Sequence, residues 1–202
     1  IHRLHLERYS GQFRPIRGLI LTPTRELAMQ IEDNILGYTK GMKLFSVTLF
    51  GGVSQHRQVQ KLRRGVDIVV ATPGRLLDLM DQGFVNLQHL DYFVLDEADT
   101  MMDMGFIHDL RRVVKHLPQK RQSLFFSATM PPNILQFAST MLKDPERVEV
   151  AQESTAADTV DQHMLFVNQN DKRDLLVHLL KQDEVETALV FTRTKYLSLI
   201  HI

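Results

Sequence analysis

Short apolar runs alternate with amphipathic stretches along most of the chain. The runs that are rich in β-branched and aromatic residues predict buried strands at 18–22, 45–50, 67–71, 92–95 and 123–126. Apolar residues recur with the period of a helix at 25–40, 74–83, 106–117 and 132–143. The first of these helices is expected to place Leu27, Ile31, Ile35 and Tyr38 on one face. Strands that alternate with helices indicate the α/β class, with a parallel sheet flanked by helices.

The alternation of apolar runs with amphipathic stretches is interrupted near residue 150 and then resumes. Residues 1–150 are predicted to form a first domain, followed by a small, polar linker at 151–161. Residues 162–202 are predicted to begin a second domain of the same class. Its strands are expected at 163–167 and 187–191, and its helix at 171–182.

Composition narrows the function only slightly. The chain has no cysteine, which excludes a thiol nucleophile and a cysteine-ligated metal. Its histidines show no zinc-ligand spacing, and no apolar run is long enough to span a membrane. The net charge is zero, but residues 1–75 hold 12 basic and 5 acidic residues, a surplus of +7. This asymmetry indicates an anionic partner for the first part, or a solvated surface with chance clustering.

Two strand ends carry similar sequences. The segments 19–27 (LILTPTREL) and 68–77 (IVVATPGRLL) both run from a strand into Thr-Pro and then to an arginine that opens a helix. Thr can cap a helix, and Pro suits the first helical position, so both segments can be simple helix starts. Alternatively, free N–H groups and an arginine at the carboxyl end of a strand can bind phosphate. Two such turns on one sheet edge would suit successive phosphates of a nucleic acid.

Three carboxylates follow the apolar run at 92–95, in the tetrapeptide Asp96-Glu97-Ala98-Asp99. A carboxylate at a strand end beside a nucleotide commonly holds Mg²⁺, and a neighbouring Glu can position a water for attack. The alternative is an acidic first turn of a helix, which the helix dipole favours. The next run ends in Ser127 and Thr129, whose hydroxyls either cap a helix or bond Asp99.

Taken together, these segments resemble the DEAD-box ATP-dependent RNA helicases. Five motifs occur in that family's order and at about its spacing: 23–28 (PTRELA), 51–52 (GG), 72–75 (TPGR), 96–99 (DEAD) and 127–129 (SAT). The resemblance covers nearly the whole chain. The stretches 102–113 and 189–195 are similar to the bacterial RhlE-like branch.

The resemblance implies two RecA-like domains that close around ATP and single-stranded RNA in the cytoplasm. Asp96 would hold Mg²⁺, Glu97 would position the hydrolytic water, and Asp99 would bond Ser127 and Thr129. The RNA-facing residues would be Pro23, Thr24, Arg25, Gly52, Thr72, Pro73, Gly74 and Arg75. They would contact the sugar-phosphate backbone, which suits an enzyme that accepts any sequence.

Some features of that family are missing from this sequence. No G-x-x-x-x-G-K-[ST] phosphate loop occurs in the 202 residues, and the family's arginine fingers are expected beyond them. We therefore expect the fragment alone to lack RNA-stimulated ATP hydrolysis. The stretch 197–202 (LSLIHI) replaces an expected amphipathic helix and back-translates to a sequence like a transposon-end adapter, so we interpret it as an artefact.

Two rival functions follow from the same residues. One is an RNA-binding module that works without ATP, which the missing phosphate loop favours. The other is a different α/β hydrolase of phosphate compounds that uses Asp96. The paired Thr-Pro turns argue against the second rival.

Overall fold

The computed structural model describes residues 1–7, 11, 14–149, 160–161, 163–182 and 185–192. The chain divides into two compact units, Ile1–Arg147 and Val148–Ile202, and each is described by itself. Most of the predicted linker, 151–159, lies outside the described residues, as does 197–202.

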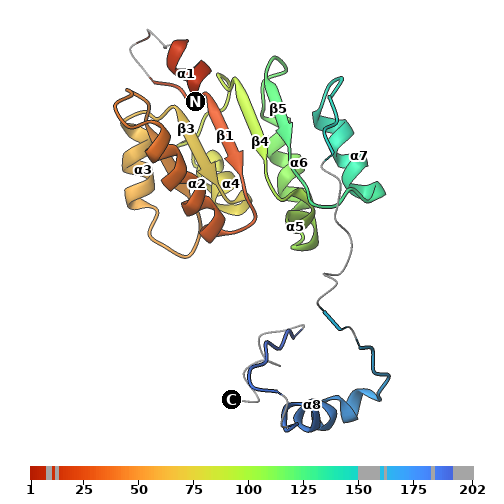
Figure 1. Ribbon diagram of the computed structural model, residues 1–202. Helices are drawn as coiled ribbons and strands as arrows, with labels where there is room; N and C mark the ends of the chain where they lie inside the picture. Colours follow the sequence, from red (N-terminus) through yellow and green to blue (C-terminus); the bar gives the residue numbers. More distant parts are fainter. Residues whose placement is uncertain (8–10, 12–13, 150–159, 162, 183–184, 193–202) are drawn as a thin grey trace. The chain divides into compact units, whose positions relative to one another are not determined.

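Parallel strands form the centre of the first unit, in the order β2-β3-β1-β4-β5 (Figure 1). Their bounds are β1 Gly18–Leu21, β2 Ser46–Leu49, β3 Ile68–Ala71, β4 Tyr92–Leu95 and β5 Gln122–Phe125. Each coincides with one of the predicted runs, and every pairing in the sheet is parallel. The α/β class with a parallel sheet flanked by helices is confirmed.

Helices connect the strands and cover both faces of the sheet. Their bounds in this unit are α1 His2–Leu6, α2 Arg25–Tyr38, α3 His56–Arg63, α4 Pro73–Asp81, α5 Ala98–Asp103, α6 Ile107–Lys115 and α7 Pro132–Met141. Four of them match the predicted helices to within a few residues. The short helices α1, α3 and α5 were not predicted from the apolar period.

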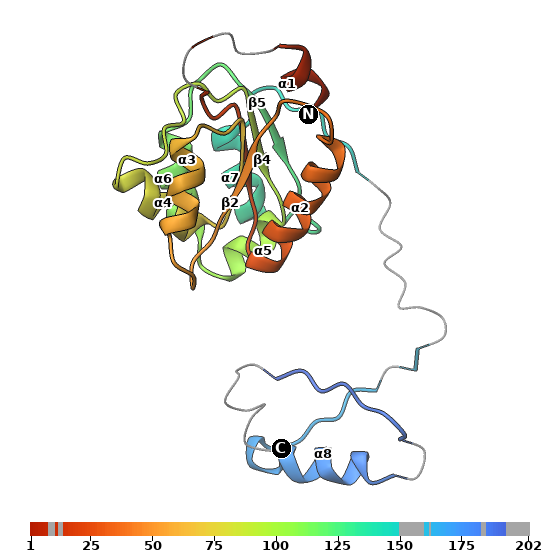
Figure 2. The ribbon, with the colours of Figure 1, turned by 90° about the vertical axis from the view of Figure 1, so that its left-hand side faces the viewer.

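The alternation of side chains along β3 divides the core in two. Ile68 and Val70 pack with Ala28 and Ile35 of α2 on one face, together with Leu4 of α1. The opposite face holds the larger cluster, to which α3, α4, α5, α6 and α7 contribute. Figure 2 shows α2 on one side of the sheet and α3, α4 and α6 on the other. Strands buried on both faces explain why the apolar runs are continuous.

The prediction of which side chains of α2 are buried is only partly correct. Ile35 is buried, but Tyr38 is 67% exposed and Ala28 takes its place in the core. Tyr38 is the last residue of the helix, and the residue buried at this end is the C-cap Thr39. Position in the helix therefore overrides the period at this residue.

The second unit contains one 3₁₀ turn, Gln169–Asp171, and the helix α8, Lys172–Leu180, among its described residues. The strands expected at 163–167 and 187–191 do not form there. A strand needs a neighbour that accepts and donates its backbone hydrogen bonds, and the described residues of this unit provide none. The side chains of Phe166 and Phe191 are accordingly 93% and 88% exposed. No helix in the described parts of the chain has both the length and the apolar character that crossing a bilayer requires.

Candidate functional site

All the strands of the sheet end in one row. The register pairs Leu21 with both Ala71 and Leu95, and it extends outward to Leu49 and Phe125. The residues that follow this row therefore leave the sheet along one edge. We call the loops and helix starts at 22–26, 50–54, 72–75, 96–99 and 126–129 the carboxyl edge.

The first Thr-Pro turn differs from the expected helix start. Thr22 is fully buried, and its hydroxyl donates a hydrogen bond to the carbonyl of Thr24 at 3.1 Å. Thr24 is the residue that caps α2, since its hydroxyl accepts the N–H of Leu27 at 3.3 Å. Pro23 thus precedes the cap instead of occupying the first helical position, and Arg25 begins the helix.

The second Thr-Pro turn does follow the expected pattern in its backbone. Thr72 is the extended N-cap residue of α4, and Pro73 occupies the first helical position. Pro73 is buried and Gly74 is exposed. The hydroxyl of Thr72 makes no capping hydrogen bond, however, so it remains at the carboxyl edge for another partner. The two similar sequences therefore form two different helix starts.

An open depression of about 480 Å³ lies at the carboxyl edge. It gathers residues from three strand ends and from the segment after α5: Pro23, Thr24, Arg25, Glu26, Gly51, Gly52, Thr72, Met104 and Phe106. Most of the predicted RNA-facing residues thus share one surface. The sequence did not predict that Met104 and Phe106 line this depression. A methionine near a helix end usually packs inside the protein. Met101 does pack, at 0% exposure, whereas Met104 is 51% exposed.

Gly52 and Arg25 approach each other closely in this depression. Gly52 has a φ of +78°, which favours glycine, and a Cβ built there would lie 2.8 Å from Nη1 of Arg25. Glycine therefore serves two needs at this position: a left-handed turn and room for a guanidinium. Arg25 itself is exposed at the start of α2.

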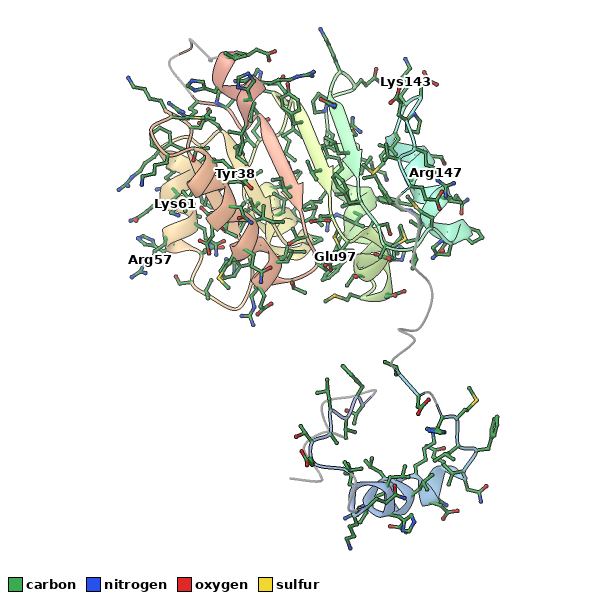
Figure 3. The ribbon with its side chains drawn as sticks, viewed as in Figure 1. Tyr38, Arg57, Lys61, Glu97, Lys143 and Arg147 are labelled. Carbon is green, nitrogen blue, oxygen red and sulfur yellow. The ribbon has the colours of Figure 1, made fainter. Side chains whose placement is uncertain are left out.

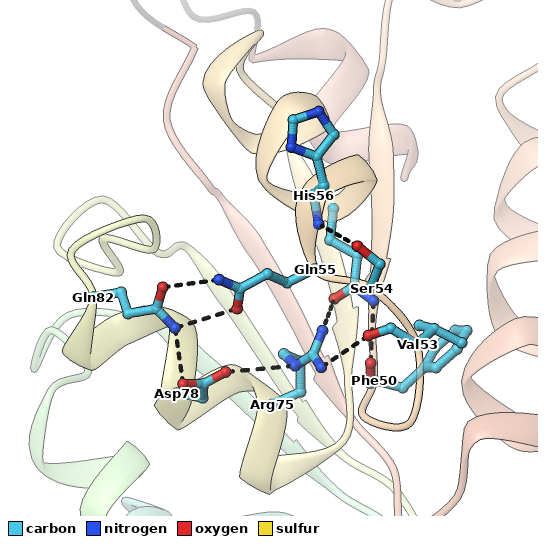
Figure 4. A network of polar contacts seen from close by, with 9 residues as sticks. Phe50, Val53, Ser54, Gln55, His56, Arg75, Asp78 and Gln82 are labelled. Atoms are coloured by element: carbon cyan, nitrogen blue, oxygen red, sulfur yellow. Dashed lines mark hydrogen bonds and ion pairs between the residues drawn. The ribbon is translucent and has the colours of Figure 1, made fainter.

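Arg75, which the resemblance predicts to face RNA, makes its polar contacts within the protein in this structure. Its guanidinium donates to Oε1 of Gln58 and to the carbonyl of Val53, both at 3.2 Å, and Nε lies 3.6 Å from Asp78 (Figure 4). Only 13% of the Arg75 side chain is exposed. Gln58 in turn donates to the carbonyl of Phe50 at 3.1 Å. Arg75 therefore fastens the loop 50–54 to α4.

Glu97 stands in a strained backbone conformation directly after Asp96. Its φ and ψ are 49° and 53°, in the left-handed region that non-glycine residues rarely adopt. Its side chain is exposed, and its N–H donates to Oδ1 of Asp96 at 3.0 Å. Residues with such a strained backbone occur mostly at functional sites, and each costs about 1–3 kcal/mol. The turn directs Asp96 and Glu97 to the carboxyl edge before α5 begins.

Asp99 bonds Thr129 across the sheet edge. One carboxylate oxygen of Asp99 accepts both the N–H of Thr129 at 2.9 Å and its hydroxyl at 2.8 Å. Ser127 takes part through the backbone: its hydroxyl accepts the N–H of Asp99 at 3.3 Å and donates to the carbonyl of Thr129 at 2.7 Å. Burial alone would raise the pKa of Asp99, but the hydrogen bonds from Thr129 and Thr100 outweigh it, and the pKa lies below its ordinary value.

Asp96 is a chemically suitable ligand for a hard cation. Mg²⁺ is usually held by one or two carboxylates with waters and substrate phosphates, so a single strand-end carboxylate fits that role. Nowhere in the described residues do three His, Asp or Glu side chains cluster as a complete metal site would need. The protein groups therefore fit a magnesium ion that a nucleotide helps to bind, and not a metal held by protein alone.

Comparison with known proteins agrees with this arrangement. The family model for the DEAD/DEAH box helicase matches residues 3–137. The DEAD-box ATP-dependent RNA helicase CshA of Streptococcus pneumoniae serotype 4 is 40% identical over 94% of this chain and 36% of its own length. The ATP-dependent RNA helicase RhlB of Pseudomonas aeruginosa is 43% identical, over 94% of this chain and 48% of its own.

A solved structure shares the fold as well. The yeast DEAD-box splicing factor Prp28 superposes with a TM-score of 0.61 at 32% identity, over 66% of this chain and 34% of that chain. The sheet is thus of the RecA-like type expected from the resemblance. The chain spans between about a third and a half of the length of the curated relatives it matches. The narrower likeness to the RhlE-like branch is not tested by these relatives and stays a prediction. With the motifs, the sheet and the family match in agreement, the chain belongs to the DEAD/DEAH box helicase family.

Proposed function

We propose that this chain is part of an ATP-dependent RNA helicase, which couples ATP binding and hydrolysis to local unwinding or remodelling of RNA duplexes. The observation that carries the proposal is the single row of strand ends. It brings the carboxylates of 96–99 and the depression around Arg25 and Gly52 to the same edge of one sheet. Binding at a nucleotide site can then affect binding at a polyanion site on the same edge, because few residues separate the two.

The residues divide the work as follows. Asp96 would hold Mg²⁺ together with the phosphates of ATP, and the ion would neutralise negative charge that develops on them. Glu97, exposed on its strained turn, would orient the attacking water and accept its proton. Asp99 would connect the nucleotide side to β5 through Thr129.

The depression would hold the sugar-phosphate backbone. Arg25 offers a guanidinium, and Thr24 and Thr72 offer polar groups at helix starts. Gly51 and Gly52 allow the backbone of the RNA to come close to that of the protein. Backbone contacts of this kind carry no sequence information, which suits an enzyme that acts on many RNAs. A cytoplasmic location stays a prediction from the sequence.

The proposal is tested by replacing Glu97 with Gln in the full-length protein. We expect RNA-stimulated ATP turnover to fall by at least 10²-fold, the size of a general-base contribution, while RNA binding in the presence of ATP is retained. Turnover by phosphate release and RNA binding by fluorescence anisotropy would be measured on the same preparation. Unchanged turnover would rule out the role given to Glu97.

A second candidate function is RNA binding without turnover. It is favoured by one observation, the lack of a G-x-x-x-x-G-K-[ST] motif in the 202 residues. For the chain alone, we therefore expect RNA binding without RNA-stimulated ATP hydrolysis. Clear hydrolysis by a pure preparation would exclude this second function.

A further inference from the structure

A second groove, of about 710 Å³, lies between α2, the edge strand β2 and α3. Its lining includes four apolar side chains from these elements and the following loop: Met29, Val47, Phe50 and Val53. Met29 and Val53 are 44% and 46% exposed, so an apolar surface is left open to solvent. A surface of this kind can receive a flat, apolar group such as the face of a nucleobase.

Two cations stand on the rim of this groove. Arg57 and Lys61 lie one helical turn apart on α3, and both are exposed. In the described part of the chain, Arg57 forms no ion pair. Lys61 is 57% exposed and lies 3.8 Å from Glu32, a geometry that contributes little to stability. Both cations thus remain able to meet phosphates.

Glu32 decides which part of a nucleotide can enter. Its side chain is only 12% exposed at the floor of the groove, beneath Lys61, and it lies 3.4 Å from the hydroxyl of Ser46. A buried carboxylate repels phosphate but can accept a hydrogen bond from a base amino group. The charges therefore favour a base inside the groove and its phosphates outside, on Arg57 and Lys61.

The groove is continuous with the carboxyl edge through the loop 50–54. Gly51 and Gly52 line the depression described above, whereas Phe50 and Val53 line this groove. Arg75 holds the loop in place by its bond to the carbonyl of Val53. Figure 3 shows Arg57 at the same end of the sheet as Glu97, with Lys61 farther along α3. A strand that leaves the depression over this loop would therefore meet Arg57 first.

We infer that this groove is a second RNA subsite, which takes a nucleotide that flanks the segment held at the carboxyl edge. The base enters over Met29 and Phe50, and Arg57 and Lys61 bind the adjacent phosphates. The inference rests on the proposed function, because it extends the same RNA strand. An acidic segment of a partner protein is the competing occupant, and the continuity with the carboxyl edge favours RNA.

The test compares two RNA lengths on the 202-residue chain. Fluorescein-labelled oligouridines of about 6 and about 12 nucleotides, lengths within the range that single-strand-binding modules cover, are titrated by anisotropy. The variant is R57Q/K61Q. The matched control is R111Q/K115Q, which removes an exposed basic pair of the same spacing from α6 and leaves the groove unchanged. Circular dichroism checks that each variant folds.

The expected result is specific to the longer RNA. R57Q/K61Q should weaken binding of the longer RNA by roughly 5- to 30-fold, from two ion pairs of about 0.5–1 kcal/mol each, and leave the shorter RNA unaffected. The slope of log affinity against log salt should fall by about 1.4 for the longer RNA, since each single-strand phosphate contact contributes about 0.7. The α6 control should match the unaltered chain.

Other outcomes overturn the inference in distinguishable ways. If the unaltered chain binds both lengths equally, or R57Q/K61Q keeps the advantage of the longer RNA, the subsite is wrong while RNA binding at the carboxyl edge stands. If neither RNA binds, the subsite and the ATP-independent RNA-binding function both fail, whereas the helicase function is decided by the Glu97 experiment on the full-length protein. If a labelled oligoglutamate peptide binds through Arg57 and Lys61 in preference to the longer RNA, the groove belongs to a protein partner.

Discussion

Replacing Gly52 with Ala separates what this glycine does for the fold from what it does for Arg25. The new methyl group would meet Nη1 of Arg25 at 2.8 Å, closer than a Cβ normally approaches another atom. The contact is with the far end of an exposed, flexible side chain, which can move away. We therefore expect the guanidinium to leave its place in the depression, and not the sheet to distort.

The magnitude follows from the backbone and from one lost ion pair. Alanine at a φ of +78° costs about 1–2 kcal/mol relative to glycine. For a unit of this size, that corresponds to a fall in melting temperature of roughly 2–8 °C. Displacing Arg25 removes one phosphate contact of about 0.5–1 kcal/mol, or roughly a 2- to 5-fold loss of RNA affinity.

Two other glycines provide matched controls. Gly83 has a φ of +76° with nothing within 4 Å of an added Cβ, so G83A carries the backbone cost alone. Gly37 lies within α2 with equal space around it, so G37A should stabilise the chain by about 0.5–1 kcal/mol. Urea unfolding and anisotropy with the shorter oligouridine would be measured for all three variants.

The expected pattern is that G52A and G83A lose similar stability and only G52A loses RNA affinity. A G52A chain that binds RNA as well as the unaltered one would refute the placement of Arg25 against the RNA. Equal loss of binding in G83A would show that general destabilisation, and not Arg25, explains the effect.

Three further predictions concern the titrating and catalytic groups. T129V removes one hydrogen bond to Asp99, so its pKa should rise toward the ordinary value. Because the pKa is lowered in the fold, Asp99 stabilises the chain above its ordinary pKa and loses this effect as the pH falls. Carboxyl NMR titration measures the pKa of Asp99, and thermal unfolding at several pH values measures the stability. An unchanged Asp99 pKa in T129V would contradict the hydrogen-bond account. Burial raises the pKa of Glu32 although Lys61 opposes it, so stability should be lost as the pH rises through that raised value. E32Q should flatten this part of the melting-temperature curve above the ordinary pKa of a glutamate, and parallel curves would disprove the effect. E97Q in the full-length protein should lower ATP turnover by at least 10²-fold and keep ATP-dependent RNA binding, in the phosphate-release and anisotropy assays proposed above.

The sequence was sufficient for the sheet and for the row of strand ends. Each strand is a continuous apolar run because it is buried on both faces, and parallel connections then align the ends. The positions of Thr24, Arg25 and Gly52 around one depression follow from that alignment. These features depend on local pattern and topology, both of which a sequence carries.

Features that depend on particular neighbours were not predictable in the same way. Arg75 has the same sequence context as Arg25, yet Gln58 and Asp78 draw its guanidinium inward. Asp78 lies three residues further along α4, but Gln58 lies on α3, and its contact with Arg75 depends on where α3 lies relative to α4, which no local motif records. Met104 reaches the depression because α5 ends at Asp103 and the chain turns at that point. The unformed strands of the second unit show the same limit, since β propensity alone provides no partner.

The strained turn at Glu97 is held from both sides. The N–H of Asp96 donates to the carbonyl of Leu21 on β1, and the N–H of Ala98 donates to the carbonyl of Phe126 after β5, both at 3.0 Å. A non-glycine residue keeps a left-handed conformation only where its surroundings fix it. Phe126 directly precedes the segment that bonds Asp99. The end of β5 therefore supports both the backbone of Glu97 and the carboxylate of Asp99, so a movement there would reach the proposed water-positioning residue directly.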